Sequence, residues 1–260
     1  MLYAAVRGAS AHRAVSRPPV QTPLGFKMCG LSAMESGEFE PDETRQVTAL
    51  LCEVTVLVNI GANTGYYVCL ARKAGAKVVA IEPLDRNVQV LQRNVMANGW
   101  NDVEIFPVGL GDRVDVLKLY GGGTAASLVE GWAGAAREHY RLVPVSTLDI
   151  VLGDRFSGEK ILILIDVEGF ELNVLRGALR QFTRKPSPIW FIEVCIDEHQ
   201  PNGVRINPDL VETFEVFWRH GYRAEKAGSD RGPVSESDVR AWAAGIQLPK
   251  THNFIFRRAD

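Results

Sequence analysis

The chain has 260 residues, of which 46% are hydrophobic, enough to bury one large α/β core. Its formal net charge of −2 and pI near 6.2 argue against a nucleic-acid partner. No apolar run approaches the ~18 residues of a membrane span. The four cysteines lack paired metal-ligand spacing, which favours reduced thiols and a cytoplasmic location.

The first 34 residues differ in composition from the rest of the chain. They contain no Asp or Glu but carry Arg7, Arg13, Arg17 and Lys27. This composition predicts a basic, flexible N-terminal arm over 1–34, and a transit peptide is the alternative. Residues 35–260 show no internal repeat or second boundary, so they are predicted to form one domain.

The first half of this domain alternates between helical and strand patterns. A helix over 44–51 precedes a buried strand over 54–60, and a helix over 66–74 follows. The next elements are a strand over 77–81, a helix from Asp85 that Gly99 closes, and a strand over 103–108. This order predicts half of a doubly wound parallel sheet.

The alternation then breaks and later resumes. Strands over 114–120 and 141–146 predict an antiparallel insertion over the mouth of the site, with the triple glycine 121–123 as a joint. The apolar strand over 161–165 is predicted to be central. The remaining elements are a helix over 171–179, a strand over 189–192, a helix over 208–220, a short strand over 222–225, a helix that Ser235 caps and a strand over 252–256.

The turn between the first strand and the next helix indicates a nucleotide-like ligand. Gly61 and Gly65 allow close approach of the backbone, and Glu82, twenty-one residues after Gly61, can accept ribose hydroxyls. A dinucleotide fingerprint needs glycines where this chain has Asn63 and Tyr66. The pattern therefore favours S-adenosylmethionine over a dinucleotide, and a turn without a ligand is the alternative.

Several motifs in this order resemble the FkbM-type methyltransferases, a branch of the S-adenosylmethionine-dependent class I fold. The resemblance covers roughly residues 35–257. The matching pieces are Gly37-x-x-Glu40, Ile60-Gly-Ala-Asn-Thr-Gly65, Ile81-Glu-Pro83, Arg93-Asn-Val95 with Asn98-Gly99, Ile165-Asp-Val-Glu-Gly169, Val174-Leu-Arg-Gly-Ala178, Ile192-Glu-Val194, Gly221-Tyr222 and Asn253-Phe-Ile-Phe256.

The resemblance implies a Rossmann-like α/β fold with a seven-stranded sheet, mostly parallel with an antiparallel last strand, and a β-insertion after strand three. It also implies an S-adenosylmethionine-dependent methyltransferase (EC 2.1.1 class), with O-methylation of a hydroxyl on a small metabolite, sugar, glycan or polyketide-like acceptor. The family usually has an aspartate where this chain has Asn59. A degenerate, non-catalytic binding module that acts as a partner subunit is therefore the alternative function.

The expected cofactor residues lie at the carboxyl ends of the predicted strands, where ligands bind in open α/β sheets. Val108 and Gly109 are expected at the adenine, and Ser127 is included by family position. The set is Asn59, Gly61, Ala62, Asn63, Gly65, Glu82, Pro83, Val108, Gly109, Ser127 and Asp166.

The expected catalytic residues are Asp166, Glu193 and His199. An alcohol acceptor needs a base or a metal to take or polarise its proton. Asp166 and Glu193 end neighbouring strands, so they could form a carboxylate base pair or bind Mg²⁺. Candidates for acceptor contacts are Trp132, His139 and Tyr140. The acidic pI and the lack of an aromatic-proline tetrad after strand four make nucleic-acid methylation a weaker hypothesis.

Overall fold

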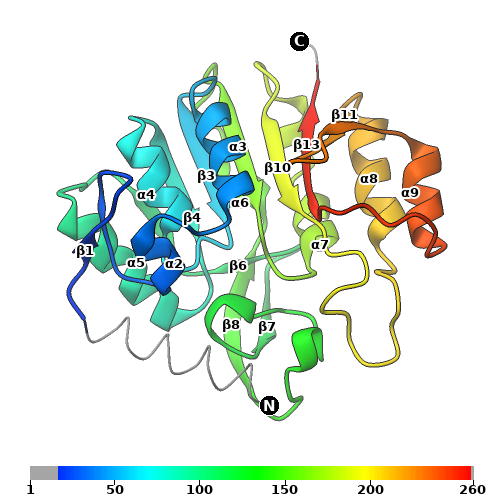
Figure 1. The fold of residues 1–260 in the computed structure, drawn as a ribbon, viewed down its shortest axis with the longest axis horizontal. Helices are drawn as coiled ribbons and strands as arrows, with labels where there is room; N and C mark the ends of the chain where they lie inside the picture. Colours follow the sequence, from blue (N-terminus) through cyan, green and yellow to red (C-terminus); the bar gives the residue numbers. More distant parts are fainter. Residues whose placement is uncertain (1–16, 259–260) are drawn as a thin grey trace.

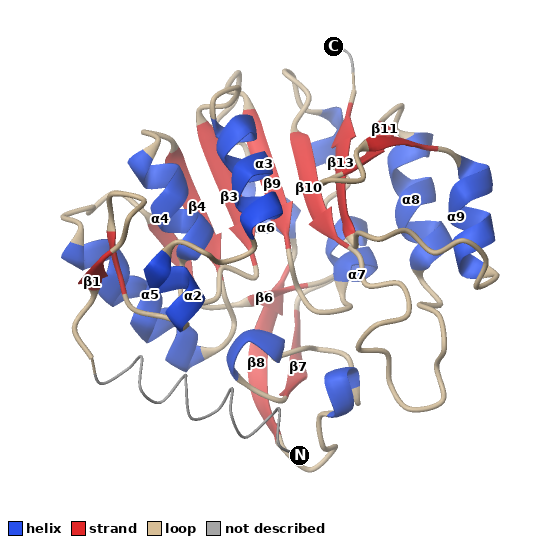
Figure 2. Ribbon diagram, viewed as in Figure 1, coloured by secondary structure: helices blue, strands red, loops and turns tan. Residues whose placement is uncertain are grey.

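The computed structural model describes residues 17–258 and contains one large eight-stranded sheet with helices on both faces (Figures 1 and 2). The strands of this sheet are β3 (Val56–Ile60), β4 (Lys77–Ile81), β5 (Glu104–Phe106), β9 (Ile161–Ile165), β10 (Ile189–Glu193), β11 (Arg223–Lys226), β12 (Gly232–Val234) and β13 (Asn253–Arg257). Their spatial order is β12-β11-β13-β10-β9-β3-β4-β5.

The sheet confirms the predicted Rossmann-like α/β class. Strands β5, β4, β3, β9 and β10 pair in parallel, and β13 is antiparallel to both β10 and β11. The sheet has eight strands rather than the expected seven, because β12 pairs antiparallel with β11 at the outer edge. Pro233 in β12 weakens the strand pattern in the sequence, but an edge strand tolerates proline since one side forms no ladder.

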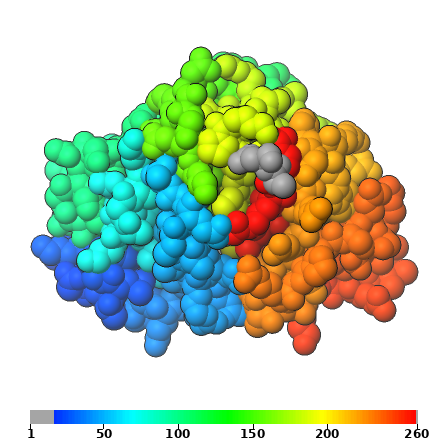
Figure 3. Space-filling view, turned by 90° about the horizontal axis from the view of Figure 1, so that it is seen from above, coloured from blue at the N-terminus to red at the C-terminus, as the bar shows by residue number. Residues whose placement is uncertain are grey.

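The strands alternate side chains between two apolar layers. Val56, Val58 and Ile60 of β3 face one layer, which includes α6 (Leu148–Leu152), α7 (Glu171–Arg176), α8 (Leu210–Arg219) and α9 (Glu236–Ala243). Leu57 faces the other, which includes α3 (Pro41–Leu51), α4 (Tyr66–Lys73) and α5 (Asp85–Ala97). Figure 3 shows blue N-terminal segments along one side of the molecule and green to yellow segments along the other. None of the helices in the described part of the chain has the length and apolar character to cross a membrane.

A three-stranded sheet lies at the carboxyl ends of the parallel strands, below them in Figure 2. It consists of β6 (Gly109–Leu110), β8 (Tyr140–Ser146) and β7 (Asp115–Tyr120), in that spatial order. The pairing of β7 with β8 is antiparallel, as the sequence predicts. Two short 3-10 helices, η1 (Gly123–Ala125) and η2 (Trp132–Gly134), connect these strands, and a third, η3 (Gln181–Thr183), follows α7. The insertion therefore places residues 109–146 beside the candidate site.

The predicted boundary at residue 34 needs correction. Residues 17–34 form a two-stranded hairpin of β1 (Val20–Gln21) and β2 (Lys27–Met28), and then enter α2 (Ser32–Ser36). Phe26 and Met28 are buried in the core that α3 and α4 also share. The domain thus includes this hairpin, because its apolar side chains find partners far along the chain. Residues 1–16 of the expected arm lie outside the described residues.

Asn94, on α5, fastens this hairpin to the domain. Its fully buried amide accepts from the Cys29 backbone N–H at 2.8 Å and donates to the Cys29 carbonyl at 2.9 Å. It also donates to the Thr64 carbonyl at 2.8 Å. One side chain therefore connects the hairpin, α5 and the glycine turn.

Candidate functional site

Packing alone requires glycine at positions 61 and 65 of the turn after β3, whether or not a ligand binds there. Gly61 and Gly65 have φ angles of 82° and 90°, which side chains other than glycine rarely adopt. A Cβ on Gly61 would lie 1.7 Å from the Asp166 carbonyl oxygen, and one on Gly65 would lie 2.3 Å from Leu91. The turn is thus pressed between β9 and α5, and it starts α4 at Gly65.

Hydrogen bonds hold the Glu82 carboxylate in place beside the glycine turn. Its buried carboxylate accepts from the backbone N–H of Asn63 and of Leu84, both at 2.8 Å, and from the Asn87 amide at 3.3 Å. Burial raises the pKa of Glu82 to about 7, although these three hydrogen bonds lower it. The carboxylate is therefore fixed in position at the carboxyl end of β4.

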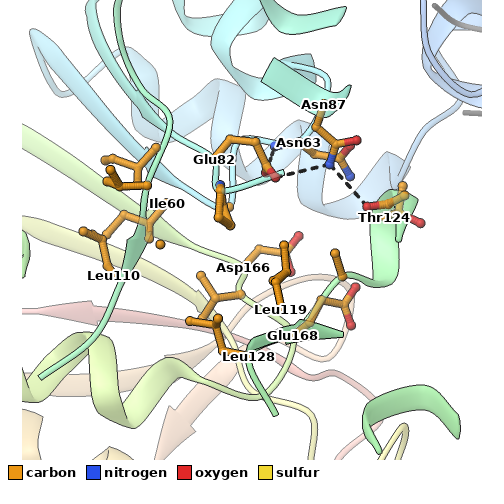
Figure 4. Close-up of a pocket in the computed structure, with 18 residues that line it drawn as sticks. Ile60, Asn63, Glu82, Asn87, Leu110, Leu119, Thr124, Leu128, Asp166 and Glu168 are labelled. Carbon is orange, nitrogen blue, oxygen red and sulfur yellow. Dashed lines mark hydrogen bonds between the residues drawn. The ribbon is translucent and has the colours of Figure 1, made fainter. Parts of the chain in front are cut away.

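A pocket opens between Glu82, the insertion and the end of β9 (Figure 4). Its empty space amounts to about 540 Å³, with the open solvent at its mouth included. One part of its wall is apolar, and Val108, Leu110, Leu119 and Leu128 supply it. Another part is acidic, with Glu82, Asp166 and Glu168.

The insertion forms one side of this pocket, and a hydrogen bond from α5 holds it there. The Asn87 amide, which contacts Glu82, also donates to the Gly123 carbonyl at 3.2 Å (Figure 4). The next residue, Thr124, lines the pocket, and its buried hydroxyl oxygen has no hydrogen-bond partner among the described residues. A buried hydroxyl without a partner is costly, so Thr124 is a candidate ligand contact.

The insertion is also joined to the loop after β9. The Trp132 indole N–H donates to Glu168 Oε2 at 2.7 Å, and the Ser127 hydroxyl donates to the Glu168 carbonyl at 2.6 Å. The Trp132 ring covers Gly169, where a Cβ would lie 2.4 Å from it. Glu168 has a φ of 56°, which is unfavourable for a residue other than glycine. The contacts with Ser127 and Trp132 hold the loop in this conformation.

Asp166 and Glu193 are brought together as the sequence predicts. Ile165 and Ile192 are paired in β9 and β10, so the two acidic residues that follow them are neighbours. Burial raises the pKa of Asp166 well above its usual range, and the charge of Glu193 raises it further. Burial and the charge of Glu168 raise the pKa of Glu193 to about 8.

The predicted metal alternative finds no support in this arrangement. Among residues 17–258, no group of three or more His, Cys, Asp and Glu side chains is arranged to hold a metal ion. The nearby His252 Nε2 lies 3.5 Å from Glu193 Oε1 and its Nδ1 lies 3.2 Å from Glu198 Oε2.

Seven of the eleven expected cofactor residues line the pocket: Gly61, Asn63, Glu82, Pro83, Val108, Gly109 and Asp166. Ala62 and Gly65 belong to the turn without lining the pocket, and Ser127 is committed to Glu168 and the Val129 N–H. Asn59 is 1% exposed, and neither atom of its amide group has a hydrogen-bond partner among the described residues.

The expected catalytic His199 is exposed and lies apart from the pocket wall. Its ring lies 6.2 Å from the Trp132 ring, and its carbonyl accepts from the Ala133 N–H at 2.8 Å. The structure therefore places His199 beside the insertion rather than at the acidic pair. The other acceptor candidates, His139 and Tyr140, are exposed on the same insertion.

Three polar residues of the site were missed by sequence reasoning. Asn87 and Thr124 contact the pocket, and Glu40 accepts from the Tyr67 hydroxyl at 2.8 Å. Burial raises the pKa of Glu40 to about 7, and the charge of Glu168 contributes to this rise. The motif Gly37-x-x-Glu40 contains a signal for Glu40, but the distance between Glu40 and Tyr67 in sequence conceals their contact.

The residues of the pocket fit S-adenosylmethionine. Glu82 could accept hydrogen bonds from ribose hydroxyls, the apolar wall near Val108 could hold an adenine ring, and the Thr124 hydroxyl has no partner among the described residues. A parallel sheet with this glycine turn and an acidic residue closing β4 defines a class I methyltransferase fold. The chain matches the model of the FkbM methyltransferase domain over residues 59–224 and belongs to this family of S-adenosylmethionine-dependent methyltransferases.

A search of curated proteins gave no significant match. Similar solved structures include an O-methyltransferase from Bacillus cereus in complex with SAH (13% identity, TM-score 0.47, covering 86% of this chain and 84% of that one). Another is a putative O-methyltransferase from Klebsiella pneumoniae (13% identity, TM-score 0.41, covering 98% and 90%). A third is the SAH-bound methyltransferase PaMTH1 from Podospora anserina (10% identity, TM-score 0.41, covering 84% and 78%). The family assignment rests on the domain match, not on these structures.

Proposed function

We propose that this protein transfers a methyl group from S-adenosylmethionine to a hydroxyl group of a small metabolite or glycan. The observation that carries the proposal is the pair of neighbouring carboxylates, Asp166 and Glu193, beside a pocket that fits the methyl donor. Bound S-adenosylmethionine would supply an electrophilic methyl group. The protein would supply alignment and a group that accepts the proton of the alcohol.

The acidic pair suits the role of general base. Two close carboxylates disfavour double ionisation, so one of them keeps a proton while the other remains available. Because burial and neighbouring charges raise the pKa values of both groups, the ionised member is a stronger base than an exposed carboxylate. Glu82, on the other side of the pocket, would hold the ribose and take no part in the proton transfer.

The test is incubation of the protein with isotope-labelled S-adenosylmethionine and a panel of hydroxylated metabolites and sugars, with mass spectrometry of the products. We expect label on oxygen in at least one acceptor. Asp166→Asn and Glu193→Gln should each lower kcat by roughly 10²–10⁴-fold if the pair acts as the base. The matched control is Asp197→Asn, which removes an exposed carboxylate close to Glu193 in sequence. Full turnover in both site variants would refute the role of the pair.

The same assay separates this proposal from a non-catalytic binding module. A protein that binds S-adenosylmethionine but labels no acceptor across the panel would favour the module. The buried, unpartnered Asn59 is the observation on which that alternative rests.

A further inference from the structure

The His252 ring lies between two carboxylates at the edge of the candidate site. His252 directly precedes β13, and its carbonyl oxygen accepts from the Val194 N–H at 2.6 Å. This hydrogen bond continues the pairing of β13 with β10 and places His252 beside the end of β10. The ring Nε2 lies 3.5 Å from Glu193 Oε1, and Nδ1 lies 3.2 Å from Glu198 Oε2. Each ring nitrogen therefore has a carboxylate next to it, one from the acidic pair and one from the loop after β10.

These side chains lead from the pocket to the surface. Asp166 lines the pocket and follows β9, whereas His252 precedes β13, and these two strands lie on opposite sides of β10. Side-chain exposure increases from 26% in Glu193 to 40% in His252 and 57% in Glu198. The four groups thus form a series in which Asp166 faces the pocket, Glu193 and His252 follow, and Glu198 faces solvent.

The two contacts of the ring restrict where a proton can lie. An ionised carboxylate accepts hydrogen bonds and donates none, so the ring can donate to both neighbours only when each of its nitrogens carries a proton. If the ring is neutral, one neighbouring carboxyl group must carry the proton instead. Glu193 and His252 are therefore placed to exchange a proton, while Nδ1–H of the ring faces Glu198.

A proton on His252 supplies a positive charge next to an otherwise acidic group of residues. The charges that act on both members of the pair come from the N-cap of α3, the loop after β9 and the start of α7, and they are those of Glu168, Glu40 and Glu171. The Cys195 thiol, 3.6 Å from Glu193, is neutral, since burial raises its pKa. Glu43 of α3 accepts from the amide of Asn253, the residue after His252. Lys250, two residues before His252, acts on Asp230.

We propose that His252 is a positioning residue that sets the charge of the acidic pair: it takes a proton from Glu193, with Glu198 behind it, and keeps the pair singly ionised. The inference deepens the proposed function, on which its catalytic consequence rests. When the acceptor hydroxyl gives its proton to the pair, one proton must leave before the next turnover. That proton passes from Glu193 to Nε2 of His252, and the ring releases one to solvent.

The expected direction of the pH effect follows from the charge of the ring. Burial and acidic neighbours raise the pKa of Glu193 to about 8 and that of Asp166 well above its usual range. An adjacent positive charge favours the ionised form of a carboxyl group and lowers its pKa. Removal of the His252 charge should therefore move the first ionisation of the pair to higher pH. Activity should then fall at pH 7 and be kept at pH 9, where the pair is ionised without help.

The first experiment is an NMR titration of the full chain between pH 5 and 10, with ¹³C in the carboxyl groups of Asp and Glu and ¹⁵N in the histidine rings. Asp166→Asn and Glu193→Gln assign the two carboxyl signals. We expect the first ionisation of the pair mainly on Glu193, with both nitrogens of the His252 ring protonated at that pH. His252→Gln should raise this midpoint by about one pH unit, and His252→Lys, which restores a positive charge, should lower it again. The same midpoint in His252→Gln and the wild type, or a neutral ring beside the ionised pair, would overturn the inference.

The second experiment measures methyl transfer to an acceptor from the labelled panel between pH 6 and 9. His252→Gln should lower kcat roughly three- to tenfold at pH 7 but not at pH 9, with the KM for S-adenosylmethionine unchanged, and His252→Lys should regain activity at pH 7. The control is His220→Gln, since His220 stacks on Phe182 and does not line the pocket. An equal loss at every pH would indicate a structural role and overturn the inference.

The titration needs neither methyl donor nor acceptor, so it separates this inference from the proposed function. The expected midpoint shifts without a labelled product from any acceptor would support the charge assignment and refute the proposed methyl transfer. Thermal unfolding of each His252 variant shows whether it is folded.

Discussion

The carbonyl oxygen of Asp166 lies where a side chain on Gly61 would begin. The two residues directly follow the adjacent strands β3 and β9, and the Asp166 N–H donates to the Ile60 carbonyl at 3.0 Å. The backbone of the proposed donor site and the backbone that carries the proposed base are therefore in direct contact. A change in one position must displace the other.

Gly61→Ala should lower the free energy of unfolding by more than about 2 kcal/mol, because it adds a backbone clash to an unfavourable φ angle. Urea unfolding measures the loss. Gly75→Ala is the matched control, since Gly75 has a similar φ of 88° but nothing within 4 Å of a Cβ. Similar losses in the two variants would contradict the close contact.

Glu171→Gln should stabilise the protein above neutral pH. Burial raises the pKa of Glu171 from 4.5 to about 7, so its ionisation opposes folding. The penalty is absent below the unfolded pKa, grows as pH rises from about 4.5 to 7, and reaches about 3 kcal/mol above that. Urea unfolding at pH 5 and 8 measures it. Glu138→Gln, at an exposed carboxylate, is the control, and an unchanged pH profile in Glu171→Gln would refute the assignment.

Trp132→Phe should loosen the insertion, because phenylalanine cannot donate to Glu168 while its ring still covers Gly169. A hydrogen bond to a charged group contributes roughly 1.5–3 kcal/mol. We expect faster amide hydrogen exchange across 121–139 and weaker donor binding. Trp218→Phe on α8 is the control. Unchanged exchange across the insertion would show that this hydrogen bond does not hold it.

Asn59→Asp should destabilise the free protein by roughly 1–3 kcal/mol at neutral pH, because it buries a carboxylate without a partner. The same variant should gain more thermal stability from S-adenosylmethionine than the wild type, since the ligand brings positive charge. Asn59→Leu is the matched comparison without charge. An Asn59→Asp protein as stable as the wild type without ligand would show that solvent or another group reaches position 59.

Local pattern in the sequence was enough to predict the α/β sheet, apart from β12, and seven of the residues that line the pocket. The apolar runs of β3 and β9 predict strands that are buried on both faces. The position of Glu82 at the end of β4 is predicted from its spacing after Gly61. The hydrogen bonds from Tyr67 to Glu40 and from Trp132 to Glu168 could not be predicted from local pattern. In each pair the two residues lie more than twenty-five positions apart in the sequence. The N-terminal hairpin was missed for a related reason. Its few apolar residues show no period, and their burial depends on α5, which lies about sixty residues later.

The three hydrogen bonds of Asn94 set a limit on how far this protein can be shortened. Removal of residues before 35 would delete both partners at Cys29 and leave a buried amide with the Thr64 carbonyl alone. The same cut would uncover apolar core that Phe26 and Met28 now fill, and water would reach the rear of the glycine turn. A recombinant fragment intended for crystallisation or ligand screening should therefore begin no later than Arg17, even though the family match starts at residue 59.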